Sequence, residues 1–203
     1  MARQVVGLLM AAGRGRRFAA AAPAGTAEKL VAMIDGVPVA THACRSLAAG
    51  CDTVVAVVRP DAPAALLDAL DGVRRVVAPE ADLGMGHSLA AAARALAVEA
   101  PVAVLVLPAD MPWVSADTVR RIVAAARDGH GGDPAARIVV PVLADGRRGH
   151  PVSFGAAHLP ALAHLSGDRG ARGLLDTHPL HTITVDDAGI LRDVDTPTDL
   201  PPS

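Results

Sequence analysis

Three short apolar runs constrain the fold of this chain more than any other feature of its sequence. They are residues 5–11 (VVGLLMA), Thr53–Val58 (TVVAVV) and residues 102–107 (VAVLVL). Strands of a parallel sheet have near-continuous apolar sequences of this kind, because helices bury both faces of the sheet. Amphipathic stretches rich in Ala and Leu alternate with the runs, as βαβ connections require. The sequence therefore predicts an α/β fold with a mostly parallel sheet covered on both faces.

The remaining elements follow from the same alternation. Helices are expected over 38–49, 62–70, 87–97, 115–127 and 156–165, and further strands over 74–77, 137–142 and 181–185. The chain has 203 residues, which fits a single domain spanning 1–203. Aromatic residues make up only 1% of it, whereas hydrophobic residues make up 51%. Its core must therefore be packed mainly from Ala, Val and Leu.

Charge and cysteine content exclude several classes of function. The formal net charge of −2 gives no basic field for nucleic acid or an anionic membrane. Cys44 and Cys51 form no CxxC pair and are expected to be reduced thiols. No apolar run approaches the ~20 residues of a membrane span, and the amino-terminal run is too short for a secretion signal. A cytoplasmic protein is the expectation.

The first segment with chemical content follows the first apolar run. Its members are small or basic: Ala11, Ala12, Gly13, Arg14, Gly15, Arg16 and Arg17. In parallel α/β sheets, ligands bind beyond the carboxyl ends of the strands. Small residues there let the backbone approach a ligand, and successive N–H groups can bind phosphates. The arginines can neutralise phosphate charge, so the segment predicts a phosphate site, with a plain tight turn as the alternative.

Two aspartates are candidate metal ligands. Asp110 lies in Leu-Pro-Ala-Asp-Met-Pro, just beyond the apolar run 102–107, and Asp195 lies in Asp-Val-Asp-Thr-Pro. Mg²⁺ is commonly held by one or two carboxylates together with substrate phosphates. A turn or helix-capping role is the alternative for each residue. Asp195 is interpreted as a ligand because Asp110 requires a partner carboxylate.

These segments resemble the motifs of a known superfamily. Residues 9–18 resemble the Ala-Ala-Gly-x-Gly-x-Arg signature of the sugar-nucleotide and cofactor nucleotidyltransferases, and 107–112 resemble their metal-binding aspartate motif. Within that superfamily the chain is most similar to the molybdenum cofactor cytidylyltransferase group of the MobA-like NTP transferase family, from about Val5 to Leu200. The resemblance implies a Rossmann-like three-layer α/β/α sandwich of the nucleotide-diphospho-sugar transferase type.

The resemblance also implies roles for individual residues. The loop from Ala11 to Gly15 would hold the phosphates of an NTP, Arg17 would contact them, and Lys29 would support the transition state. Lys29 is the single lysine in the chain, so it is the one candidate for this role. The family places its lysine only a few residues after the position of Phe18. Here residues 19–28 intervene, and we expect them to form an insertion loop.

Two further segments complete the expected site. Gly84, Met85, Gly86 and Ser88 precede or begin a predicted helix, and the resemblance implies that they touch the base and ribose of the nucleotide.

His150 in Gly-His-Pro, with Arg169 and Arg172 in Gly-Asp-Arg-Gly-Ala-Arg, would bind the phosphorylated acceptor. An ordinary turn and the start of a surface helix are the alternatives for these two strings.

The function implied is Mg²⁺-dependent transfer of CMP from CTP to a phosphorylated small molecule, with molybdopterin as the expected acceptor and pyrophosphate released. CTP is favoured over other NTPs because guanylyl relatives tend to have Ala-Gly-Gly where this chain has Ala11-Ala12-Gly13. The same resemblance suggests a transient contact with a molybdoenzyme or its maturation factor.

Two alternatives belong to other classes of protein. In an NAD(P)H-dependent oxidoreductase, Gly13 and Gly15 would bind the dinucleotide and Arg59 a 2′-phosphate, although Phe18 stands where the third glycine is required. In a catalytically idle nucleotide-binding maturation factor, the two aspartates would have no purpose.

Overall fold

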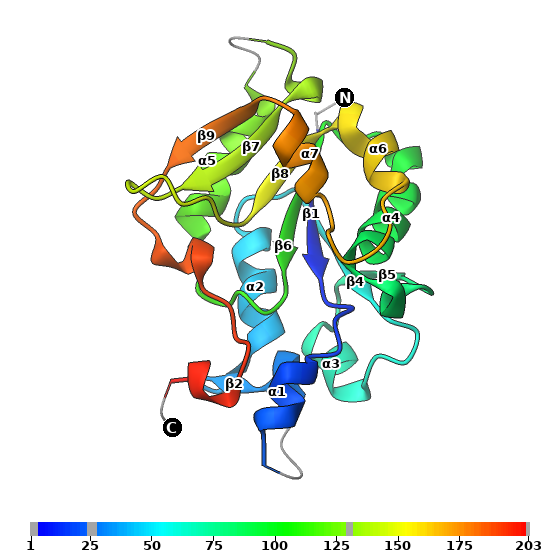
Figure 1. The fold of residues 1–203 in the computed structure, drawn as a ribbon, viewed down its shortest axis with the longest axis vertical. Helices are drawn as coiled ribbons and strands as arrows, with labels where there is room; N and C mark the ends of the chain where they lie inside the picture. Colours follow the sequence, from blue (N-terminus) through cyan, green and yellow to red (C-terminus); the bar gives the residue numbers. More distant parts are fainter. Residues whose placement is uncertain (1–3, 24–27, 129–131, 202–203) are drawn as a thin grey trace.

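The computed structural model describes residues 4–23, 28–128 and 132–201. Its main sheet has seven strands (Figure 1). From one edge to the other they are β5 (Arg74–Val77), β4 (Thr53–Val58), β1 (Val5–Met10), β6 (Ala103–Pro108), β8 (Val152–Gly155), β7 (Ile138–Val142) and β9 (Leu180–Thr184). Every pairing is parallel except the two made by β8, which runs antiparallel to both β6 and β7. The prediction of a mostly parallel sheet is confirmed.

Burial on both faces explains the apolar strand sequences. In β1, Val5 and Leu9 belong to the hydrophobic cluster on one face of the sheet, and Val6 and Leu8 belong to the cluster on the other. All four side chains are completely buried. Successive residues of a strand point to opposite faces, so a strand between two helical layers must be apolar at every position.

The helices form the two outer layers. The cluster of one face takes residues from α2 (Val39–Ala48), α3 (Ala64–Ala69) and α5 (Ala116–Arg127), and that of the other from α4 (Met85–Leu96) and α6 (Leu159–Ala163). The three-layer α/β/α prediction is therefore confirmed. Ser115 caps α5 as expected, since its hydroxyl accepts a hydrogen bond of 3.1 Å from the N–H of Thr118.

Several short elements differ from expectation. They are α1 (Arg16–Ala21), the 3₁₀ turn η1 (Lys29–Val31), the hairpin of β2 (Met33–Ile34) and β3 (Val37–Pro38), strand β8, and α7 (Arg172–Thr177). The expected loop over 19–28 starts as helix, because alanines at 19–21 extend α1 and alanine has the highest helix propensity. Residues 24–27 of that loop lie outside the described residues.

The fold brings distant segments to one edge of the sheet. The chain leaves β1, β4 and β6 at their carboxyl ends, which lie at the same edge because these strands are parallel. The C-terminal segment, orange to red in Figure 1, runs past the sheet to the end of the molecule where α1 lies. In this segment the N–H of Val194 donates a 2.9 Å hydrogen bond to the carbonyl of Asp110. Within the described ranges, no helix has the length and apolarity that crossing a bilayer requires.

Core packing can be tested with two matched leucines. Leu105 in β6 is completely buried, whereas Leu83 is 59% exposed. We expect Leu105→Ala to lower the free energy of unfolding by about 2–5 kcal/mol, because it removes buried methyl groups and leaves a cavity. Leu83→Ala should change it by less than roughly 0.5 kcal/mol. Urea unfolding followed by circular dichroism measures both, and equal effects would contradict the assigned core.

Candidate active site

A cleft of about 510 Å³ opens at the edge where the strands end. Its walls come from the loop after β1, the start of η1, the start of α4, the residues after β6 and the C-terminal segment. Of the site residues predicted from sequence, the cleft is lined by Ala12, Gly13, Arg14, Gly15, Arg17, Lys29, Gly84, Met85, Ser88, Asp110 and Asp195. The structure thus gathers most of the predicted nucleotide and metal residues in one cavity.

The loop after β1 is shaped by close contacts. Ala11 is fully buried behind the cleft, and its N–H donates a 2.9 Å hydrogen bond to the carbonyl of Val57 in β4. Gly15 has a φ of 57°, in the left-handed region that favours glycine, and immediately precedes α1. A Cβ at position 15 would lie 3.2 Å from the Cβ of Lys29. Glycine here therefore allows the loop to pass directly beside Lys29.

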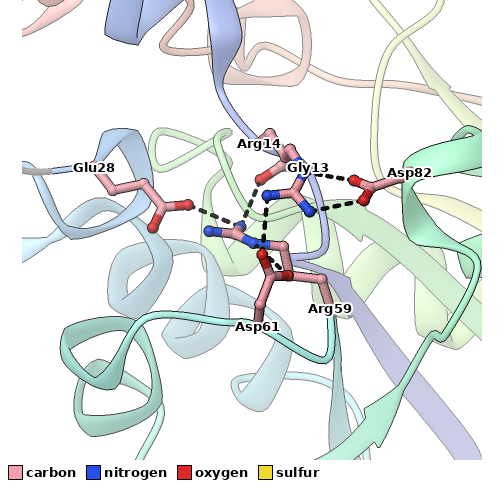
Figure 2. A network of polar contacts seen from close by, with 6 residues as sticks. All are labelled: Gly13, Arg14, Glu28, Arg59, Asp61 and Asp82. Atoms are coloured by element: carbon pink, nitrogen blue, oxygen red, sulfur yellow. Dashed lines mark hydrogen bonds and ion pairs between the residues drawn. The ribbon is translucent and has the colours of Figure 1, made fainter.

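Arg14 is bound by two carboxylates at the rim of the cleft. Its Nε lies 2.5 Å from Oδ1 of Asp82, and its Nη1 lies 3.0 Å from Oδ2 of Asp61 (Figure 2). The hydrogen bond from Arg14 lowers the pKa of Asp82, so this carboxyl group stays ionised. Because the partners are well exposed, a bound phosphate can compete for this guanidinium.

An acidic cluster lines the same cleft. Asp110, Asp193 and Asp195 each offer a carboxylate oxygen, and these three oxygens lie within 4.8 Å of one another. Asp110 and Asp195 were the expected pair, whereas Asp193 was missed. The signal that would have found Asp193 is the alternation of polar and apolar residues in Asp193-Val194-Asp195. Val194 is completely buried, so the side chains of its two neighbours point to the opposite side.

Two cations face the cluster. Nζ of Lys29 lies 2.6 Å from Oδ2 of Asp110 and 3.8 Å from Oδ1 of Asp195, and Arg17 also pairs with Asp195. Burial, followed by repulsion from Asp110 and Asp195, raises the pKa of Asp193. Negative charge therefore remains in excess around three convergent oxygen donors. That donor set fits a hard divalent cation.

The second glycine segment has a packing role that the sequence did not reveal. The N–H of Gly86 donates a 2.8 Å hydrogen bond to the carbonyl of Gly167, and a Cβ on Gly86 would lie 2.6 Å from the carbonyl oxygen of Ser166. The glycine thus lets the segment around 166–168 pack directly on the start of α4. Asp168, in the packed segment, lines the cleft together with Ser88, which is only 4% exposed.

The predicted acceptor residues lie outside the cleft lining. Arg169 and Arg172 are exposed on the surface, and Asp168 lines the cleft in their place. The ring of His150 is buried near Asp110, and burial lowers its pKa, an effect partly offset by the backbone of Val106 and the charge of Asp110. Its Nδ1 has no hydrogen-bond partner within the described part of the chain. The acceptor role of these three residues stays a prediction.

The sheet, the glycine loop and the acidic cleft define a nucleotidyltransferase fold, and comparison with known proteins agrees. The sequence model of the MobA-like NTP transferase domain family matches residues 7–183, so the chain belongs to that family. No curated protein matched the chain.

Solved structures extend the comparison. Rv0371c from Mycobacterium tuberculosis H37Rv is 29% identical over 98% of this chain and 96% of its own, with a TM-score of 0.74. The same protein has been solved in complex with manganese. A nucleotidyl transferase from Methanothermobacter (Mth528) is 25% identical over 97% of this chain and 94% of its own, with a TM-score of 0.75.

A more distant structure shares only the fold. The 4-diphosphocytidyl-2C-methyl-D-erythritol synthase of Anaerococcus prevotii DSM 20548 is 13% identical over 97% of this chain and 94% of its own, with a TM-score of 0.68.

The charge excess at the cluster predicts that Asp193→Asn stabilises the metal-free protein. The raised pKa means that the folded state holds the proton of Asp193 at a pH where the unfolded state has lost it. Ionisation of Asp193 therefore destabilises the fold, and stability falls as the pH rises through this window. We expect Asp193→Asn to have a higher unfolding temperature than the wild type at pH 7 in the presence of a chelator. Well below the pH range in which Asp193 ionises, the two proteins should unfold at the same temperature.

Asp186→Asn is the matched control, since Asp186 is exposed and lies outside the cleft lining. Differential scanning fluorimetry measures both variants. An unfolding temperature at or below that of the wild type would contradict the account of Asp193. Mn²⁺ should also shift the unfolding temperature of Asp193→Asn less than that of the wild type, because one donor is weakened.

Proposed function

We propose that this protein transfers a nucleoside monophosphate, CMP in preference to others, from an NTP to a phosphorylated small molecule and releases pyrophosphate. The observation that carries the proposal is the meeting of Lys29, Asp110 and Asp195 in one cleft beside the glycine loop. These residues come from three distant segments of the chain, and a cation facing paired carboxylates suits transfer at phosphorus.

The chain's own groups would mainly position and neutralise the reactants. Gly13 and Gly15 line the cleft, and backbone N–H groups of this loop would bind the triphosphate. Arg17 and Lys29 would turn from their carboxylate partners toward the phosphates and stabilise the charge that develops as pyrophosphate leaves. Attack by a phosphate oxygen of the acceptor on the α-phosphorus needs little covalent help from the protein, so alignment should supply most of the rate.

Asp110 and Asp195 are the proposed ligands of a divalent cation, with Asp193 as a third donor, and we propose Mg²⁺ as the ion. When bound, such a cation neutralises the triphosphate and stabilises the leaving pyrophosphate. The manganese complex of Rv0371c supports a divalent ion in this family. The three carboxylate oxygens of this chain support its placement in the cleft.

The choice of CTP rests on the loop sequence. Ala12 lines the cleft and puts a methyl group where guanylyl relatives tend to have glycine. For the acceptor, we propose molybdopterin, held by His150, Arg169 and Arg172, which lie outside the lining of the cleft. A cytoplasmic location and a transient contact with a molybdoenzyme or its maturation factor complete the proposal.

The oxidoreductase alternative is disfavoured by the surroundings of Arg59. Its side chain is only 8% exposed and already pairs with Glu28 and Asp61, so it is not available to a 2′-phosphate. An idle nucleotide-binding factor would have no use for three carboxylates facing a lysine in the cleft.

A screen of the four NTPs tests the proposal directly. Purified protein with Mg²⁺ should release pyrophosphate from CTP when reduced molybdopterin is present, and roughly tenfold or more slowly from ATP, GTP and UTP. A coupled pyrophosphatase assay measures the rates. A preference for another NTP would overturn the choice of CTP, and release with none of them would overturn the proposed function.

Asp110→Asn should abolish most of this activity while the protein stays folded. The substitution keeps the shape of the side chain but removes its charge, so we expect a loss on the order of 10²–10³-fold in kcat, as for other groups that stabilise transition-state charge. Asp186→Asn is the matched control and should retain wild-type turnover. If Asp110→Asn keeps most of its rate, the metal assignment is wrong.

A further inference from the structure

Arg59, at the end of β4, joins three segments of the candidate active site. Its Nη1 donates hydrogen bonds to the carbonyl of Gly13 at 3.2 Å and to Oε1 of Glu28 at 2.9 Å (Figure 2). Its Nε lies 3.3 Å from Oδ1 of Asp61, within ion-pair distance but outside hydrogen-bond geometry. One guanidinium thus touches the glycine loop, the residue before Lys29 and the loop that follows β4.

The position of Lys29 depends on the residues on either side of it. Glu28 is the N-cap residue of η1, and Lys29 is the first residue of that turn. Leu30, which follows, is buried in the core, whereas Glu28 is held by its contact with Arg59. The Arg59–Glu28 contact therefore fixes the backbone on the amino-terminal side of Lys29.

Burial makes the Arg59–Glu28 pair more costly to break than a surface ion pair. The two side chains are 8% and 19% exposed, whereas Arg14 and its partner Asp82 are 37% and 54% exposed. Buried charges are little screened by salt, and removing one partner leaves an uncompensated charge in the interior. The pair is therefore suited to impose one geometry on the segment that precedes Lys29.

We infer that Arg59 is a positioning residue for nucleotidyl transfer. Through Glu28 it fixes Lys29 beside Asp110 and Asp195, and through the carbonyl of Gly13 it sets the glycine loop at the matching position. The inference rests on the proposed function for the role of Lys29. It assigns to Arg59 neither a ligand nor a reacting atom.

The two contacts predict different kinetic effects. Glu28→Gln weakens only the connection to Lys29, so kcat should fall about tenfold while KM for CTP stays within about twofold, because a small misplacement of a catalytic group costs rate. Arg59→Met also releases the carbonyl of Gly13, so kcat should fall further and KM should rise severalfold. Both substitutions remove the Arg59–Glu28 contact. Adding Glu28→Gln to the Arg59→Met variant should therefore change its rate by less than about twofold.

Arg74 and Glu99 supply matched controls. They form a 2.5 Å ion pair between β5 and the 3₁₀ turn η3 (Ala97–Glu99), and neither lines the cleft. Arg74→Met and Glu99→Gln should therefore leave kcat and KM unchanged. A wild-type kcat for Glu28→Gln would overturn the inference even if Arg59→Met fails to fold.

A second measurement is independent of activity. Because Lys29 is the single lysine, acylation of its ε-amine by an amine-reactive ester can be followed at one site by peptide mass spectrometry. Its side chain is 11% exposed and pairs with Asp110, so labelling of the wild type at a fixed pH should be slow. Glu28→Gln and Arg59→Met should label several times faster, and the two controls at the wild-type rate.

The two measurements separate the inference from the proposed function. If the wild type releases no pyrophosphate from any NTP but labelling accelerates in both variants, the proposed function fails and the positioning of Lys29 by Arg59 stands. If labelling is unchanged in Glu28→Gln, the positioning role is wrong, whatever the activity of the protein.

Discussion

The common direction of β1, β4 and β6 is the constraint on which the rest of this structure depends. The loops that follow parallel strands lie at the same edge of the sheet, so the glycine loop, Arg59 and Asp110 all lie at this edge although they are far apart in the chain. The strands must be apolar in this arrangement, since helices cover both faces of a parallel sheet. The same parallel order of strands therefore explains both the apolar sequences and the position of the site.

Ion pairing is a second feature of the cleft. Three of its basic residues already have carboxylate partners: Arg14 pairs with Asp61 and Asp82, Arg17 with Asp195, and Lys29 with Asp110. These pairs hold the cations at the cleft despite a net charge near neutrality. A phosphate ligand would replace one anionic partner of these cations by another, so the three cations would be paired both before and after binding.

Local patterns in the sequence predicted much of this. Apolar runs located the strands, Ser115 located the start of α5, and the residues after β1 and β6 located the cleft. Features that depend on long-range pairing could not be found. The antiparallel direction of β8 and the contacts of Arg14, which span 47 and 68 residues, leave no local trace.

The contacts of Arg59 also could not be predicted from the sequence. Its position after β4 suggested a ligand contact, and only the fold shows that Glu28 and the carbonyl of Gly13 occupy its guanidinium. Asp193 was different, because the alternation around Val194 was visible in the sequence.

The hydrogen bond from Val194 to the carbonyl of Asp110 has a consequence for how the acidic cluster forms. Residues 193–195 follow every strand of the main sheet, and Val194 is completely buried in the same core cluster as residues of β1 and β6. Docking of this segment therefore completes the hydrophobic core and brings the carboxylates of Asp193 and Asp195 to Asp110 in one step. Until the segment docks, Asp110 and Lys29 face each other without these acidic neighbours, so a chain that has not finished folding lacks the complete cluster.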